Sequence, residues 1–128
     1  MEALRTIAIL ELLTGAGLIL FWIGFFTIGL APKNPPRGYM EYEHSFPLPD
    51  GLLSILLLAA GILLLLNNTL GSHLSLIAAG ALVFLGVLDF SFNIQNGVYK
   101  LSKSDMILNA FLNIWCVGFG IAIAVMVG

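Results

Sequence analysis

Charged side chains are scarce in this sequence. They make up 9% of the 128 residues, whereas hydrophobic residues make up 59%; soluble domains average roughly 45–50% apolar and about 25% charged residues. Most of the charges fall in short segments between long apolar runs, and they are too few to cover a soluble domain. The medium around those runs must therefore be lipid, and the sequence predicts an integral membrane protein.

Basic residues and cysteines are also few. The five Lys and Arg residues are scattered and the net charge is −2, so no basic patch is available for the phosphates that dominate nucleic-acid affinity. The single cysteine, Cys116, excludes an intrachain disulfide and the thiol pair that quinone-linked thiol oxidation needs. No P-loop or Ser/His/Asp pattern is present. We expect no nucleic-acid partner, no cofactor and no catalytic residue.

Four apolar segments are long enough to cross a bilayer. A hydrocarbon core of about 30 Å needs about 20 helical residues, and unpaired backbone groups are so costly in lipid that only helices or closed barrels span it. The runs lack the period-two alternation of barrel strands. The sequence predicts an all-α, polytopic four-transmembrane-helix bundle forming one domain, with helices at residues 5–30, 49–67, 73–95 and 105–127.

Polar residues mark the expected helix ends. Pro49 and Asp50 favour the start of the second helix, because a missing N–H is harmless there and an acid suits the helix dipole. Ser72 is the expected N-cap of the third helix, and Ser102 with Asp105 the expected cap of the fourth.

The first connection, residues 31–48, is long and contains four of the five prolines together with aromatic residues. Loops beyond about 12–15 residues are usually functional or disordered, and the aromatic residues favour an ordered cap on the membrane surface. Glu41, Glu43 and His44 are the polar candidates in this cap. Their spacing permits weak metal binding, but a charged patch on a solvated loop is commoner, so we predict no metal site.

The basic residues also give an orientation. An even number of crossings places both termini and the second loop on one side, where Arg5 is the only basic residue. The first and third loops carry the others, which are Lys33, Arg37, Lys100 and Lys103. The positive-inside rule places the first and third loops inside. We expect a multi-pass protein of the plasma membrane of a prokaryote.

Polar residues inside the apolar runs are the candidate binding site, because an ionisable group at mid-membrane costs at least about 2.5–3.5 kcal/mol. At 100° per residue, Asp89 and Asn93 share a face of the third helix, and Asn109 and Asn113 share a face of the fourth. At 1.5 Å per residue, Asp89 and Asn113 lie about 10–12 Å below the helix ends. The matching depths predict contact between the two helices. These stripes continue through Asn96 on one helix and through Asp105, Cys116 and Gly120 on the other.

Two interpretations of these stripes remain open. Asparagine pairs can simply hold helices together, with about 0.6–2 kcal/mol per bond. A carboxyl group among amides at mid-membrane can instead stay neutral, exchange a proton or attract a cation, which favours a functional role for Asp89.

Glu11 is the second ionisable residue within an apolar run. It shares a helix face with Gly15 and Trp22, which is the expected inward face because glycine permits close approach. It lies on the half of the membrane opposite Asp89 and only one turn below Ile7, so its side chain has room to snorkel to the surface. Structural and functional roles for Glu11 have about equal weight.

Three functions fit these features. The first is a small-ligand binding or transport protein for a solute, ion or lipid, with Asp89, Asn93, Asn109, Asn113 and Glu11 as ligand-binding residues. The second is a non-catalytic accessory subunit, in which the polar stripes and the small-residue pairs Gly118/Ala122 and Gly120/Ala124 pack in a homodimer or a larger membrane complex. The third is a lipid- or isoprenoid-modifying enzyme with Glu11 and Asp89 as the acid–base pair, which their different depths disfavour.

Overall fold

The computed structural model describes residues 2–29 and 33–128, and within these ranges it contains helices and no strand. The long helices are α1 (Glu2–Thr27), α3 (Pro47–Leu65), α4 (Thr69–Gln95) and α5 (Lys103–Val127). Two short helices lie in the connections, which are α2 (Tyr39–Glu43) and the 3₁₀ helix η1 (Val98–Lys100). Four helical stretches are long and apolar enough to cross a membrane, and the second of them includes α2 as well as α3. The prediction of an all-α membrane bundle with four crossings is confirmed.

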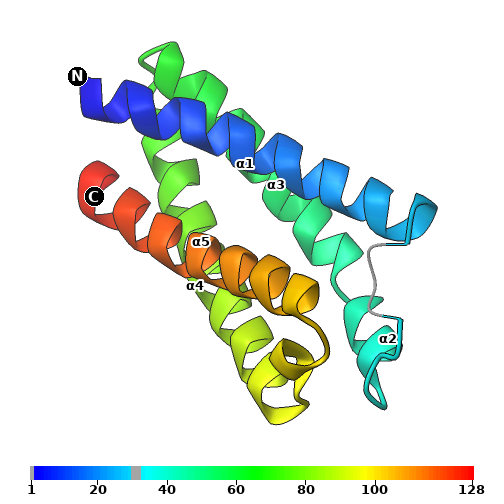
Figure 1. Ribbon diagram of the computed structural model, residues 1–128. Helices are drawn as coiled ribbons and strands as arrows, with labels where there is room; N and C mark the ends of the chain where they lie inside the picture. Colours follow the sequence, from blue (N-terminus) through cyan, green and yellow to red (C-terminus); the bar gives the residue numbers. More distant parts are fainter. Residues whose placement is uncertain (1, 30–32) are drawn as a thin grey trace.

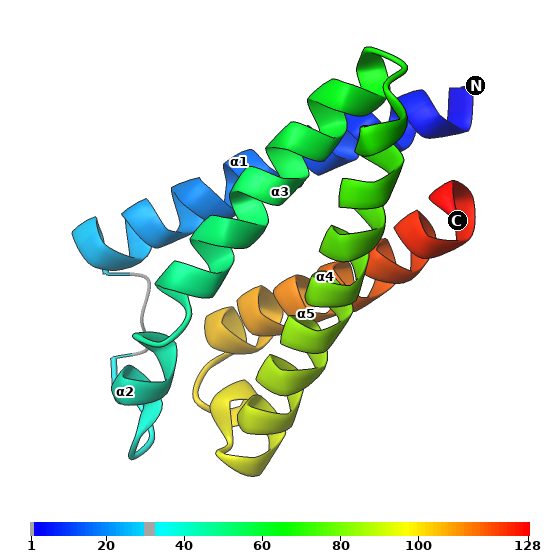
Figure 2. The same cartoon turned by 180° about the vertical axis from the view of Figure 1, so that it is seen from behind.

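The helices pack as two pairs (Figures 1 and 2). α1 runs along α3 and α4 runs along α5, while α3 and α4 contact each other and join the pairs. α1 and α5 contact each other much less. Both termini lie at one end of the bundle, and α2 lies at the other end beside the α4–α5 connection. The first and third connections therefore share one end and the two termini share the other, as four crossings require.

Aliphatic side chains fill the interior between the four long helices. Leu57 of α3, Leu82 of α4 and Ile123 of α5 are fully buried there. In lipid, such contacts act through van der Waals packing rather than through exclusion of water. The helix surfaces that face outward also carry many large exposed hydrophobic side chains, which suits contact with hydrocarbon.

Two glycines set the distance between α4 and α5. A Cβ atom added to Gly86 would lie 2.8 Å from Cγ2 of Val117, and one added to Gly120 would lie 2.8 Å from the backbone oxygen of Ala79. A side chain at position 120 would displace the backbone of α4, and one at position 86 would displace the Val117 side chain of α5. This close approach brings the polar faces of α4 and α5 within hydrogen-bonding reach.

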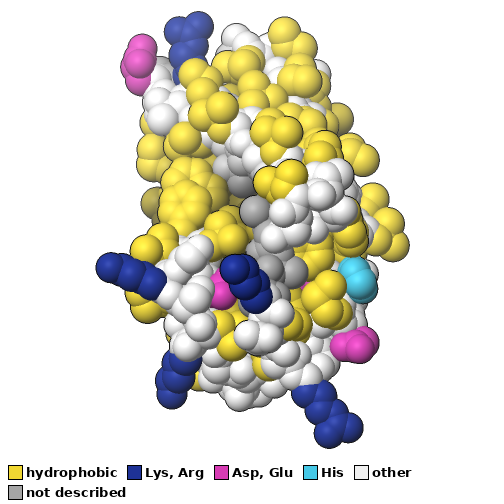
Figure 3. Space-filling model, turned by 45° about the vertical axis from the view of Figure 1, so that its right-hand side comes forward, with side chains coloured by type: hydrophobic (Ala, Val, Ile, Leu, Met, Phe, Trp, Pro, Cys, Tyr) yellow, Lys and Arg dark blue, Asp and Glu magenta, His cyan; other side chains and the backbone are white. Residues whose placement is uncertain are grey.

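The outer surface is hydrophobic along most of its length. Leu20, Ile55, Phe84 and Ile114, one from each long helix, are between 65% and 73% exposed. On the face shown in Figure 3, Lys and Arg side chains lie toward the two ends, and hydrophobic side chains cover most of the stretch between them. Continuous exposed apolar surface of this kind is typical of a lipid-facing bundle.

Several helix ends differ from the sequence prediction. α4 begins at Thr69 rather than at residue 73, and its N-cap is Asn68, whose side chain accepts a hydrogen bond from the Leu70 N–H at 2.9 Å. The prediction of Ser72 as N-cap is wrong because Asn67, with φ of 57°, ends the turn after α3 at once. α3 begins at Pro47, two residues earlier than predicted.

α5 begins at the predicted cap, and α1 ends before the predicted residue. The Ser102 cap is confirmed, since its hydroxyl accepts from the Asp105 N–H at 3.0 Å and donates to the Asp105 carboxylate at 2.7 Å. α1 ends at Thr27, before Gly29 with φ of 72°. The predicted helix end at residue 30 and the start of the loop at residue 31 lie outside the described residues.

Candidate functional site

The first connection packs against the end of the bundle through α2. Tyr39 forms a small buried cluster with Phe25 of α1 and Val98 of η1. The ring of Tyr42 stacks on Phe92 of α4, with centroids 3.8 Å apart and planes 3° from parallel. These contacts place α2 between the two helix pairs, where its inner face closes one end of the interior.

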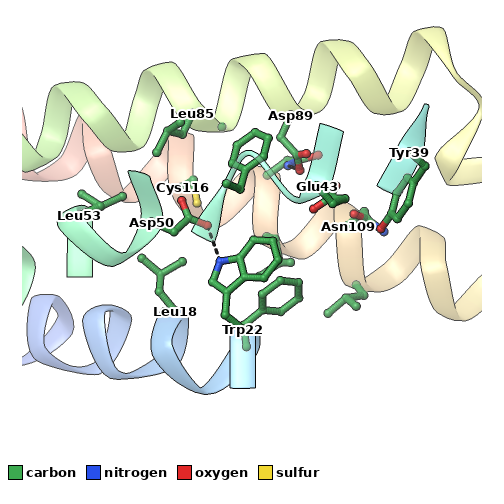
Figure 4. A pocket seen from close by; sticks show the side chains of 16 residues that line it. Leu18, Trp22, Tyr39, Glu43, Asp50, Leu53, Leu85, Asp89, Asn109 and Cys116 are labelled. Atoms are coloured by element: carbon green, nitrogen blue, oxygen red, sulfur yellow. Dashed lines mark hydrogen bonds between the residues drawn. The ribbon is translucent and has the colours of Figure 1, made fainter. Parts of the chain in front are cut away.

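A cavity of about 70 Å³ lies behind α2, between the α1–α3 pair and the α4–α5 pair (Figure 4). Carboxyl groups reach it from three helices: Glu43 of α2, Asp50 of α3 and Asp89 of α4. Its aromatic lining consists of Phe21, Trp22, Tyr39 and Phe46. α5 contributes the rest of the polar wall through the amides of Asn109 and Asn113 and the thiol of Cys116.

Asp89 is the centre of a hydrogen-bond network on the cavity wall. The amide of Asn113 donates to Asp89 Oδ2 at 2.6 Å, and the amide of Asn93 donates to the same oxygen at 3.4 Å. Asn93 also donates to Asn113 Oδ1 at 3.1 Å. The Tyr42 hydroxyl approaches Asp89 Oδ1 at 3.5 Å, and the Tyr99 hydroxyl donates to Asn113. Donors from three helices thus converge on one carboxylate.

Tyr99 belongs to η1, outside the long helices, and supports this network from the end of the bundle. Desolvation raises the pKa of its phenol above the ordinary value. The hydroxyl therefore stays protonated at neutral pH and remains a donor to Asn113.

The predicted polar stripes of the third and fourth helices meet only in part. Asp89, Asn93 and Asn113 come together, whereas the Asn109 amide lines the cavity but donates to the Asp105 backbone oxygen of its own helix at 2.9 Å. Asn96 is exposed and donates to the backbone oxygen of Phe92, so its expected place in the stripe is wrong. α4 ends at Gln95, so Asn96 is the C-cap with non-helical backbone angles, and its side chain turns back to the last turn of its own helix instead of toward α5.

Glu11 lies elsewhere and is completely buried, with 0% exposure, so the snorkelling that its expected depth allowed does not occur. α1 begins at Glu2, which places Glu11 roughly 13 Å along the helix rather than one turn from its start. The Ser75 hydroxyl of α4 lies near its carboxyl group, yet neither group has a hydrogen-bond partner of proper geometry among the described residues.

The distance along α4 separates Glu11 from the cavity. Ser75 and Asp89 are 14 residues apart (89 − 75), which is roughly 21 Å at 1.5 Å per residue. Glu11 does not line the cavity. The structure therefore does not bring Glu11 and Asp89 together as one acid–base pair.

Of the three loop candidates, only Glu43 lines the cavity. Its side chain is 7% exposed, whereas Glu41 and His44 are exposed and the His44 ring stacks on Phe26 with centroids 5.8 Å apart. The expectation of one solvated charged patch is wrong for Glu43. The helical turn of α2 places Glu43 on the same inner face as Tyr39, four residues earlier, and turns Glu41 outward. Among the described residues, no three His, Cys, Asp or Glu side chains lie close enough to hold a metal ion.

Sequence reasoning missed Asp50 and Trp22 as members of the site. Asp50, which was assigned only to the helix start, is 9% exposed and accepts a hydrogen bond from Trp22 Nε1 at 2.7 Å (Figure 4). Trp22 lies five residues before the end of α1 and Asp50 three residues after the start of α3. The sequence did contain a signal for this contact, because Trp22 and Asp50 lie at similar depths on two consecutive antiparallel helices.

No protein-family model matches this chain, and neither a curated protein nor a solved structure matches it. The helices themselves define its class: it is a small multi-pass integral membrane protein with four crossings.

Proposed function

We propose that this protein binds a small solute in the cavity behind α2, with Asp89 as the principal binding group. The observation that carries the proposal is the 2.6 Å hydrogen bond from Asn113 to Asp89 at the cavity wall. A carboxyl group inside a membrane protein is costly and usually serves a ligand, ion or proton. Here the cost is offset by donors that also fix the position of the carboxylate.

The cavity distinguishes this proposal from a purely structural role. Hydrogen bonds between α4 and α5 would hold the helices together without any space beside them and without further acids. The Asp89 network instead borders a cavity of about 70 Å³ that two other carboxyl groups also reach. A single water needs about 10–15 Å³ in such a cavity, so the space suits a solute of a few non-hydrogen atoms.

Binding can be followed through Trp22, which lines the cavity and is one of two tryptophans. In a Trp115→Phe background, Trp22 is the only tryptophan, and its emission should respond to an occupant beside its ring. We expect at least one member of a panel of small cationic, neutral and anionic solutes to bind the purified chain saturably. Asp89→Asn should weaken that binding about tenfold or more, because it removes a charge in a low-dielectric site.

The matched control is Asp105→Asn, which removes an acid from the first turn of α5, outside the cavity. Its affinity for the same solute should equal that of the parent. If no member of the panel binds saturably, or if Asp89→Asn binds as tightly as the parent, the proposed function is wrong.

A further inference from the structure

We propose that the solute is a small organic cation, whose ammonium or guanidinium group binds among the carboxyl groups of Glu43, Asp50 and Asp89. This inference rests on the proposed function and names the ligand class of the same cavity.

The charges on the cavity wall are all of one sign. Glu43, Asp50 and Asp89 line it, and among the described residues no Lys, Arg or His side chain does. Glu43 lies within electrostatic reach of both other acids. An anionic solute would find no positive charge on this wall, whereas a cation would favour the ionised forms of these acids and pair with them.

Glu43 gives independent evidence for a missing donor. Asp89 accepts hydrogen bonds from side chains of α2, α4 and α5, and Asp50 accepts one from Trp22. Glu43 is 7% exposed and lines the cavity, and among the described residues no side-chain hydrogen bond ends on its carboxyl group. Buried carboxyl groups are normally hydrogen-bonded. A ligand with N–H groups and a positive charge would donate hydrogen bonds to the Glu43 carboxyl group and pair with it electrostatically.

The aromatic lining favours an organic cation over an inorganic one. The rings of Phe21 and Trp22 meet edge to face, with centroids 5.1 Å apart, and Phe46, at the start of α3, adds a further ring to the lining. Such rings attract weakly hydrated cations through their faces. Calcium takes six to eight oxygen ligands, and the described residues hold no cluster of three metal-ligating side chains.

Three probes of the same planar shape separate charge from size: guanidinium, urea and acetate. Each is titrated against the Trp115→Phe chain through Trp22 emission at concentrations on the order of 10 mM, far below those that unfold proteins. We expect saturable binding of guanidinium at least about tenfold tighter than that of urea, and no binding of acetate. This comparison uses one folded protein and does not depend on a variant.

A pair of variants on α2 then tests the assigned residue. Glu43→Gln should weaken guanidinium binding about tenfold, and Glu41→Gln, which removes an exposed acid two residues earlier, should leave it unchanged. Equal weakening by the two variants would show a surface-charge effect and overturn the assignment.

The outcomes separate this inference from the proposed function. If urea or acetate binds as tightly as guanidinium and Asp89→Asn abolishes that binding, the cation assignment is overturned and the proposed function stands. If neither these probes nor any other member of the solute panel binds, the proposed function is overturned and the inference falls with it.

Discussion

Replacing Asn113 by leucine should lower the free energy of unfolding by about 2–4 kcal/mol. Asn113 donates to Asp89 at 2.6 Å and accepts from Asn93 at 3.1 Å and from the Tyr99 hydroxyl. Leucine removes all of these bonds. The Asp89 carboxylate keeps only the longer bonds from Asn93 at 3.4 Å and from Tyr42 at 3.5 Å, and the Asn93 amide loses its closer acceptor. Each such group costs about 1–3 kcal/mol, although transmembrane hydrogen bonds often contribute less than one would expect from this figure.

Asn109→Leu is the matched control for this change. Asn109 lies one turn earlier on α5 and donates only to the backbone of its own helix, at the Asp105 oxygen. Its replacement should cost under about 1 kcal/mol, because no bond between helices is lost. Unfolding by sodium dodecyl sulfate in mixed micelles, followed by circular dichroism, measures both values. Equal losses in the two variants would show that the network does not join α4 to α5.

Replacing Glu11 by leucine should have the opposite sign and raise the free energy of unfolding by about 1–3 kcal/mol. Both carboxyl oxygens of Glu11 are buried without a partner among the described residues, and so is the Ser75 hydroxyl beside them. Leucine has a similar length and carries no polar atom to desolvate. The same detergent titration measures the change.

Glu11→Gln gives the control for shape and charge. Glutamine keeps a polar group in the same place, so its stability should lie between those of the parent and of Glu11→Leu. A loss of stability in Glu11→Leu would contradict the prediction and would indicate that Glu11 has a bound partner at this position.

The sequence predicted the crossings well because apolar length alone determines them in lipid. Equal depth on neighbouring helices was also sufficient to pair Asp89 with Asn113, since both positions are counted from the same short connection. Such counting works wherever two helices are joined by a tight turn. It fails across long connections.

The sequence did not predict the positions of Trp22, Asp50 and Glu43 because they depend on the long first connection. The register of α1 against α3 depends on the connection between residues 31 and 48, so the contact of Trp22 with Asp50 was not predicted. The inward position of Glu43 depends on a helix of five residues inside that connection. Glu11 was misplaced because α1 begins at Glu2, earlier than the apolar pattern indicated.

Cys116 offers the most direct measurement of the cavity itself, since it is the single cysteine and lines the wall. The rate at which it reacts with the cationic reagent 2-aminoethyl methanethiosulfonate can be compared with the rate for the anionic 2-sulfonatoethyl reagent. The reference is Thr69→Cys in a Cys116→Ala chain, which presents a thiol at an exposed position in the polar connection at the start of α4, outside the apolar belt. An acid-lined binding cavity predicts that Cys116 reacts about tenfold faster with the cationic reagent than with the anionic one, with no such preference at position 69. Failure of both reagents to modify Cys116, or equal rates for the two, would contradict an accessible cation-binding cavity.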